Sequence, residues 1–187
     1  MIKIEPLAIP DVKLITPPKF GDSRGFFSET WPSSKLRALG FEENFVQDNH
    51  SLSAQKGTIR GLHCQLAPYV QGKLVRVIRG AIWDVAVDIR HGSPSFGKWV
   101  AAELSAENWS QLWIPGGFLH GFCTLTPDTE VIYKVTADYA KDCERAVRWD
   151  DPILALPWPV QPGDAQLSDK DAVAPLFDPK EQWFSFP

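Results

Sequence analysis

Hydrophobic and polar residues alternate along the middle of the chain, most regularly over residues 73–89. A period of two residues is typical of β-strands, because successive side chains point to opposite faces of a sheet. Arg79-Gly80 interrupts the alternation, so the pattern predicts two strands joined as a hairpin. The predicted faces of the second strand are Trp83, Val85, Val87 and Ile89 on one side and Asp84, Ala86 and Asp88 on the other.

Further short strands are predicted at residues 99–104, 111–114, 121–125 and 130–136, separated by Gly, Pro, Asn and Ser. Short strands at this spacing favour a closed or sandwiched all-β fold. One helix is predicted at Ser33–Gly40, with a serine cap, Leu36 and Leu39 on one side, and a terminating glycine. After Trp149 the chain is rich in proline, which favours an extended arm over the barrel.

Composition narrows the class of protein. With 187 residues, 44% of them hydrophobic, the chain fits a single domain over residues 1–187 with a sizeable core. A net charge of −4 without a Lys/Arg cluster argues against nucleic-acid binding. Three cysteines without C-x-x-C spacing argue against a disulfide framework or a zinc site. The N-terminus has no long apolar run, so we expect no membrane span and a soluble cytoplasmic protein.

Two segments approximate the paired signatures of the cupin barrel: Gly57–Gln65 and Ile114–Phe122. In metal cupins the first signature contains His-x-His, whereas here Gln65 stands two residues after His63. A divalent metal wants three or four N/O donors, so the sequence predicts no metal. A metal-dependent cupin oxygenase is the competing hypothesis. An imidazole without metal in a barrel is suited to proton transfer.

Each candidate also has a structural interpretation. A histidine within a strand, such as His63, is usually a satisfied core residue. Strand parity points Arg60 and His63 apart unless Gly61 marks a bulge. Tyr133 lies between two valines on one face and fits a core position.

Three more residues carry the same ambiguity. Lys73 at a strand end is normally solvated, but within a barrel mouth it would stabilise an oxyanion. His120 follows a Pro-Gly turn and is compatible with a purely structural role. Arg24, in a glycine turn between aromatic residues, is either exposed or a phosphate ligand, since its guanidinium matches phosphate oxygens.

Taken together, the motifs identify a family. The chain resembles the dTDP-4-dehydrorhamnose 3,5-epimerases of nucleotide-sugar metabolism, and the resemblance covers nearly the whole chain in order. The motifs that carry it are Asp22–Gly25, Gln47–Ser51, Arg60–His63, Gly72–Val75, Val87–Arg90, Gly92–Gly97, Leu104-Ser105, Ile114-Pro115, His120–Phe122, Tyr133-Lys134, Trp149–Pro152 and Leu167–Asp171.

The resemblance implies a cupin-type jelly-roll barrel, with its core at about residues 45–150, assembled as a homodimer without metal or cofactor. It implies an isomerase acting on a dTDP-sugar, with His63 as general base oriented by Asp171 and Tyr133 as general acid on the opposite face of the sugar. Lys73 and His120 would lie near the C4 oxygen. The remaining substrate-binding positions that it implies are Arg24, Glu29, Gln47, Asp48, Asn49, Arg60, Tyr139, Glu144 and Lys170.

Two departures from the family pattern are small. Cys64 occupies a position that is usually aromatic in the family. Lys141 occupies a position after Tyr139 where proline is common, which makes the Tyr139 loop less rigid.

The alternatives are a mono-epimerase or ketoisomerase of the same barrel and a non-catalytic nucleotide-sugar-binding cupin. Eight tryptophans and 12% aromatic residues exceed what the barrel interior needs, so we expect an aromatic dimer interface near Phe26-Phe27.

Overall fold

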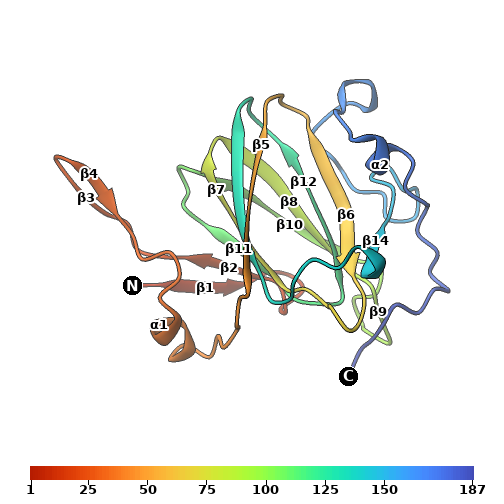
Figure 1. Ribbon diagram of the computed structural model, residues 1–187, viewed down its shortest axis with the longest axis horizontal. Coiled ribbons are helices and arrows are strands. Elements are labelled where there is room, and N and C mark those ends of the chain that lie inside the picture. The colour runs from red at the N-terminus through yellow and green to blue at the C-terminus, as the bar shows by residue number, and fades with distance from the viewer.

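Two antiparallel β-sheets enclose the core of the protein in the computed structural model, which describes residues 1–187 (Figure 1). The larger sheet contains, in order, β1 (Lys3–Pro6), β2 (Lys13–Thr16), β11 (Gln111–Ile114), β7 (Lys73–Arg79), β13 (Thr129–Val135) and β5 (Gln47–Ser53). The smaller contains β10 (Trp99–Ser105), β8 (Ala81–Asp88), β12 (Phe118–Thr124), β6 (Ile59–Gln65) and β14 (Glu144–Ala146). The predicted all-β class is confirmed, and β1 and β2 extend the larger sheet beyond the expected barrel core.

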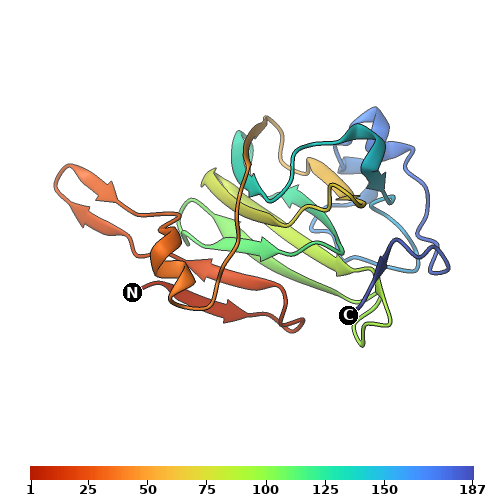
Figure 2. The same ribbon diagram turned by 60° about the horizontal axis from the view of Figure 1, so that its bottom comes forward.

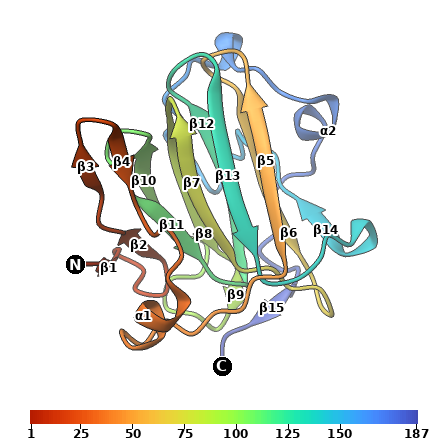
Figure 3. The same ribbon diagram turned by 60° about the vertical axis from the view of Figure 1, so that its left-hand side comes forward.

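Smaller elements lie at the margins of the two sheets. They are a β3–β4 hairpin (Phe20–Asp22 and Gly25–Phe27), a parallel pair of β9 (Arg90–His91) and β15 (Phe184–Ser185), and two short helices, α1 (Ser33–Arg37) and α2 (Asp169–Ala172). The β3–β4 hairpin projects away from the barrel in Figures 1 and 2, whereas α2 lies near β6 in Figure 3. No helix is long and apolar enough to cross a membrane.

The predicted hairpin around Arg79-Gly80 is wrong. Both strands exist, but β7 belongs to the larger sheet and β8 to the smaller, so the chain turns a corner between the sheets. Gly80 makes this corner with φ +77°, and a Cβ there would lie 2.5 Å from the hydroxyls of Thr126 and Thr129. Alternation identifies a strand and its faces, but it carries no information on which strand lies beside it.

Both faces of β8 are buried. Ile82 and Ala86 pack into the core between the sheets, against residues from the larger sheet such as Val75. Val85 and Val87 face outwards, where the C-terminal segment covers them with Leu154 and other apolar side chains. This segment contains little regular secondary structure and runs beside the smaller sheet (Figure 1).

The helix at the N-terminal side is shorter than predicted. It ends at Arg37, and its N-cap is Pro32 without a side-chain hydrogen bond, so the predicted serine cap is wrong. Leu36 is buried, but Leu39 lies beyond the last turn and is 55% exposed. The predicted terminating glycine, Gly40 at φ +78°, closes the turn after the helix: its N–H donates to the Arg37 carbonyl and the Phe41 N–H donates to the Leu36 carbonyl, both at 3.0 Å.

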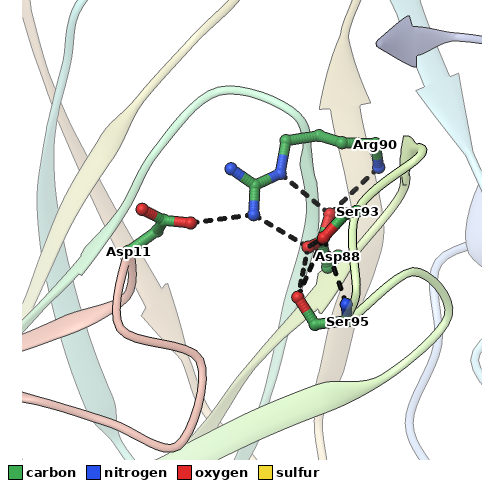
Figure 4. Close-up of polar contacts among 5 residues, drawn as sticks. All are labelled: Asp11, Asp88, Arg90, Ser93 and Ser95. Atoms are coloured by element: carbon green, nitrogen blue, oxygen red, sulfur yellow. Dashed lines mark hydrogen bonds and ion pairs between the residues drawn. The ribbon is translucent and has the colours of Figure 1, made fainter. Parts of the chain in front are cut away.

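A buried ion-pair cluster holds the loop after β8 (Figure 4). The Asp88 carboxylate is fully buried and accepts hydrogen bonds from the Arg90 side chain at 2.8 and 2.9 Å and from the Ser93 and Ser95 hydroxyls at 2.6 Å. Burial alone would raise the pKa of Asp88, but these donors lower it below its usual value. Arg90 also reaches Asp11 at 2.9 Å. The cluster therefore ties the N-terminal segment to the end of β8.

A bulge in β6 decides where the catalytic candidates point. His63 lies opposite His120 on β12 and Arg60 lies opposite Phe122, so two residues of β6 face the single Gly121 of β12. The bulge at Gly61, the condition for Arg60 and His63 to point the same way, is therefore present. It reverses the parity of the strand, and Arg60 and His63 line the same cavity.

Gly61→Ala is expected to destabilise the fold by about 2–6 kcal/mol. Gly61 has φ +114°, which costs a side-chain-bearing residue about 1–3 kcal/mol. Its Cβ would also lie 2.5 Å from the His120 carbonyl oxygen, and such overpacking adds about 1–3 kcal/mol. Urea unfolding measures the loss. Gly40→Ala is the matched control, because φ is also positive there but the space is open; equal losses in the two variants would contradict the steric argument.

Candidate active site

A cavity of about 440 Å³ opens between the two sheets. The larger sheet contributes Lys73 and Tyr133, and the smaller sheet contributes His63 and His120. The other residues around it are Ser51, Thr58, Ile59, Arg60, Phe122, Gln166, Leu167, Ser168, Lys170 and Asp171.

A second cavity of about 330 Å³ shares His63, Lys73 and Tyr133 with the first. The two cavities therefore form one cleft that these three residues divide. The remaining lining of the second cavity is Gln47, Asn49, Cys64, Gln65, Gln71, Tyr139 and Glu144. Most of the predicted site residues thus gather in one cleft.

His63 forms a short hydrogen bond with Asp171, at 2.6 Å between Nε2 and Oδ1. Asp171 lies on α2, whose N-cap Ser168 accepts a hydrogen bond from the Asp171 backbone N–H. Burial alone would raise the pKa of Asp171, but the hydrogen bond from His63 and its charge lower it below the usual value. The ionised carboxylate holds a proton on Nε2 and leaves Nδ1 of His63 as the basic nitrogen.

The C-terminal segment is fixed so that Asp171 reaches this position. Gln166 forms a parallel bridge with Thr58, just before β6. The Ile59 N–H donates to the Gln166 carbonyl, and the Gln166 N–H donates to the Gly57 carbonyl, both at 2.9 Å. The β6 edge therefore anchors the segment that supplies the partner of His63.

His120 forms a second histidine–carboxylate pair, with Asp84 of β8 at 2.6 Å. Burial lowers the pKa of His120 despite the opposing effect of Asp84, and the nearby Lys73 charge lowers it further. Asp84 is fully buried and its Oδ2 has no hydrogen-bond partner within the chain. The sequence places Asp84 with Ala86 and Asp88 on the less hydrophobic face of β8, opposite Trp83, Val85 and Val87, so the pattern gave no sign that this face points inwards.

Lys73 is the cation that both cavities of the cleft share, while Arg60 and Lys170 line the first cavity only. Burial lowers the pKa of the Lys73 ammonium, while the carboxylates of Asp84 and Glu144 act in the opposite direction. It makes no ion pair or hydrogen bond within the chain, so its three donors are free for a ligand. The neighbouring Cys64 is buried, which raises the pKa of its thiol to about 12 and keeps it protonated at neutral pH.

Tyr133 lies on β13, across the cavity from the His63 strand. Burial raises the pKa of its phenol, although the Arg60 charge opposes this, so the hydroxyl is protonated at neutral pH. Arg60 itself is held by hydrogen bonds to Ser53 Oγ at 3.2 Å and to the Leu52 carbonyl at 3.1 Å. The cleft therefore has an imidazole on one wall and a protonated phenol on the other.

Tyr139 and the residues around it form the outer end of the second cavity. The Tyr139 hydroxyl donates to Glu144 at 3.0 Å, and Lys170 pairs with the same carboxylate at 2.5 Å. Gln47 accepts from the Tyr139 N–H at 3.3 Å and donates to Asn49 at 2.7 Å. Polar side chains surround an exposed aromatic ring, an arrangement that suits a planar polar ligand.

Three predicted positions lie outside this cleft. Asp48 points to the outer face of the larger sheet, where it pairs with Lys134 at 2.8 Å. Strand parity explains this, because Gln47 and Asn49 on either side point inwards. Arg24 is on the β3–β4 hairpin and pairs with Asp22 at 2.6 Å, and Glu29 follows the hairpin and pairs with Lys35. Neither Arg24 nor Glu29 lines either cavity of its own chain.

No three His, Cys, Asp or Glu side chains lie together in an arrangement that could hold a metal ion. Gln65 points towards the loops beyond β6, where its amide binds backbone groups. That the protein needs no metal remains a prediction for experiment.

Comparison with known proteins identifies the family. Residues 6–179 match the family model described as dTDP-4-dehydrorhamnose 3,5-epimerase. The chain belongs to the dTDP-4-dehydrorhamnose 3,5-epimerase family. An epimerase of this name from Sinorhizobium fredii is 56% identical over 90% of this chain and 86% of its own length. Another, from Shigella flexneri, is 54% identical over 87% of this chain and 89% of its own length.

Solved structures of the epimerase family confirm the cupin-type jelly-roll fold. A Bacillus anthracis epimerase, solved with TDP and PPi bound, has a TM-score of 0.91 and 50% identity, covering 95% of this chain and 100% of its own. A Legionella pneumophila enzyme in complex with dTDP-4-keto-L-rhamnose has a TM-score of 0.88 and 46% identity, covering 94% and 93%. A 3'-monoepimerase from Streptomyces bikiniensis in complex with dTDP-quinovose has a TM-score of 0.84 and 34% identity, covering 92% and 86%.

Proposed function

We propose that this protein inverts C3 and C5 of dTDP-4-keto-6-deoxy-D-glucose and so forms dTDP-4-keto-L-rhamnose. The observation that carries the proposal is the pairing of a carboxylate-bound imidazole, His63, with a protonated phenol, Tyr133, on opposite walls of one cavity. Inversion at carbon needs a base on one face of the sugar and an acid on the other. Sequence identity is also higher to the 3,5-epimerases than to the 3'-monoepimerase.

The residues of the cleft supply each step. The C4 ketone acidifies the hydrogens on C3 and C5, because the electron pair left on carbon delocalises onto the C4 oxygen as an enolate. His63 takes the proton, and Asp171 stabilises the imidazolium that forms. The Lys73 ammonium stabilises the enolate oxygen, with His120 beside it. Tyr133 then donates its proton to the opposite face of the carbon, which inverts the centre.

The second cavity and the exposed Tyr139 ring suit the nucleotide. In this proposal Tyr139 stacks on the base, while Gln47, Asn49, Glu144 and Lys170 bind the polar groups of the substrate. Arg60 faces the diphosphate from within the barrel. Asp48 faces outwards and has no place in this binding site.

Incubation in D₂O tests the reaction. We expect solvent deuterium at both C3 and C5 of the product, observed by NMR or mass spectrometry. Deuterium at C3 alone would identify a 3-mono-epimerase, which the likeness to the S. bikiniensis enzyme keeps as the second candidate. Binding of dTDP by calorimetry without any exchange would identify a non-catalytic binding protein. Turnover lost after EDTA dialysis and restored by Fe²⁺ or Mn²⁺ would identify a metal enzyme.

We further propose that two copies form a homodimer through the β3–β4 hairpin. Phe20, Phe26 and Phe27 are exposed by 55–66% on this projecting hairpin (Figure 1). An exposed cluster of this kind is typical of an interface. Arg24 and Glu29 would then reach the cleft of the partner, where Arg24 meets the diphosphate.

Phe26→Ser with Phe27→Ser is expected to produce monomers and to raise KM. The double change removes two of the three exposed phenylalanines of the hairpin and, in this proposal, withdraws Arg24 from the site of the other copy. Light scattering at micromolar concentration measures the mass, and steady-state kinetics measure KM. A wild-type protein that is already monomeric, or a double variant that remains dimeric, would contradict the interface.

A further inference from the structure

Gln65 fastens two loops to the end of β6. Its Nε2 donates to the Tyr69 carbonyl at 2.7 Å and to the Asp138 carbonyl at 3.1 Å, and its Oε1 accepts from the Ala140 N–H at 2.8 Å. The side chain is 4% exposed. All three bonds reach backbone groups, and two of them are on either side of Tyr139.

Only a primary amide satisfies these partners. Two carbonyl groups need two N–H donors, and one backbone N–H needs an acceptor. A glutamate at this position would place a carboxylate against two carbonyl oxygens, and a histidine would leave one of the three groups without a partner. An unpaired buried polar group costs free energy, so the residue type is strongly constrained.

Tyr139 depends on such anchors because its own side chain packs little. It is 56% exposed, and its direct contacts are a hydroxyl bond to Glu144 and a backbone bond to Gln47 at 3.3 Å. Lys141 follows in place of a rigidifying proline, so the sequence of the loop does not fix its conformation. The bonds to the Asp138 carbonyl and the Ala140 N–H hold the two residues next to Tyr139, whereas the Gln71 amide holds the loop one residue further away, at the Ala137 carbonyl.

We propose that Gln65 is a positioning residue for nucleotide binding, which holds the 138–140 segment so that the Tyr139 ring faces the base of the substrate. The inference rests on the proposed function, in which Tyr139 meets the base. Gln65 stands at the position where metal cupins have their second histidine, and its side chain is hydrogen-bonded to the loop that carries Tyr139. Gln65 touches neither the reacting carbons nor the catalytic pair.

Gln65→Met tests the proposal, because methionine keeps the length and approximate volume of the side chain but makes none of the three bonds. We expect KM for the nucleotide sugar and Kd for dTDP to rise about ten- to hundredfold, with kcat within about threefold of the wild type. Hydrogen exchange of the Ala140 amide should accelerate, since it loses its acceptor. Gln65→Glu should show the same shift in KM, because the carboxylate cannot donate.

Thr129→Val is the matched control. Thr129 is a fully buried residue at the start of β13, whose hydroxyl bonds to Thr126 in the preceding turn. It lines neither cavity, so the change should lower stability while KM stays unchanged. If Gln65→Met leaves both KM and Ala140 exchange unchanged, the inference is wrong. A wild-type protein without turnover would instead refute the proposed function, and Ala140 exchange would still report on the attachment of the loop.

Discussion

His63→Ala is expected to abolish deuterium exchange at both C3 and C5. Neither carbanion can form without a base. Of the two histidine–carboxylate pairs in the cleft, only His63–Asp171 has a partly exposed imidazole, since the His63 side chain is 26% exposed and that of His120 is 8% exposed. Loss of a general base typically costs about 10²–10⁴-fold in rate. The loss should lie at or above the upper end of this range, since His63, Asp171 and Lys73 act as a unit.

The other histidine of the cleft does not substitute for His63. His120 is buried, its Nε2 is bound to Asp84, and it lies beside Lys73 at the inner end of the cavity. Its position suits a contact with the C4 oxygen rather than with hydrogens on carbon. Exchange that persists at C5 but is lost at C3 in His63→Ala would contradict a single base and would assign one carbon to another residue.

His50→Ala serves as the control for this experiment. His50 is on the outer face of the larger sheet, paired with Glu130 at 2.9 Å, and lines neither cavity of the cleft. The His50→Ala variant shows what the replacement of a histidine outside the cleft does to folding and to exchange. Circular dichroism and thermal unfolding of both variants would show that His63→Ala remains folded, because the His63 side chain points into open space rather than into the core.

The strands between residues 73 and 136 could be predicted from the sequence to within a few residues, because alternation is a local property, whereas β1, β2, β5 and β14 were not predicted. β11 matches its prediction at both ends, and β12 begins three residues earlier than expected. The parity argument also succeeded at Gly61, where a glycine within a strand marked the bulge that brings Arg60 and His63 into one cavity. Each of these conclusions depends only on neighbouring residues.

Sheet partners and paired carboxylates could not be predicted in the same way. The turn at Arg79-Gly80 resembles a hairpin turn locally, yet the two strands belong to different sheets, and Val75 and Val77 of β7 share one core cluster with Ile82 and Ala86 of β8. Asp171 lies 108 positions after His63, and only resemblance to a family linked the two. Asp84 was passed over, since nothing in β8 itself indicates that His120 reaches it: the cross-strand neighbour of Asp84 is Phe122, and His120 lies opposite Ala86.

Tyr133→Phe is expected to separate exchange from inversion. The change keeps the ring in place among its core neighbours, so the barrel should remain folded, but it removes the buried acidic hydroxyl. His63 would still form the carbanion, with Lys73 stabilising the enolate oxygen. The proton, or solvent deuterium, would then return from the His63 side of the cleft, and the carbon would recover its original configuration.

The predicted signature is deuterium at C3, C5 or both in recovered substrate, with formation of inverted product reduced about 10²–10⁴-fold. NMR of the sugar in D₂O distinguishes label in the original configuration from label in the inverted one. Normal inversion in Tyr133→Phe would show that water or another residue supplies the opposite-face proton. Loss of all exchange would instead assign Tyr133 a part in forming the carbanion. Because Tyr133 and His63 come from different sheets, retention with exchange is the outcome that the geometry of the cleft requires.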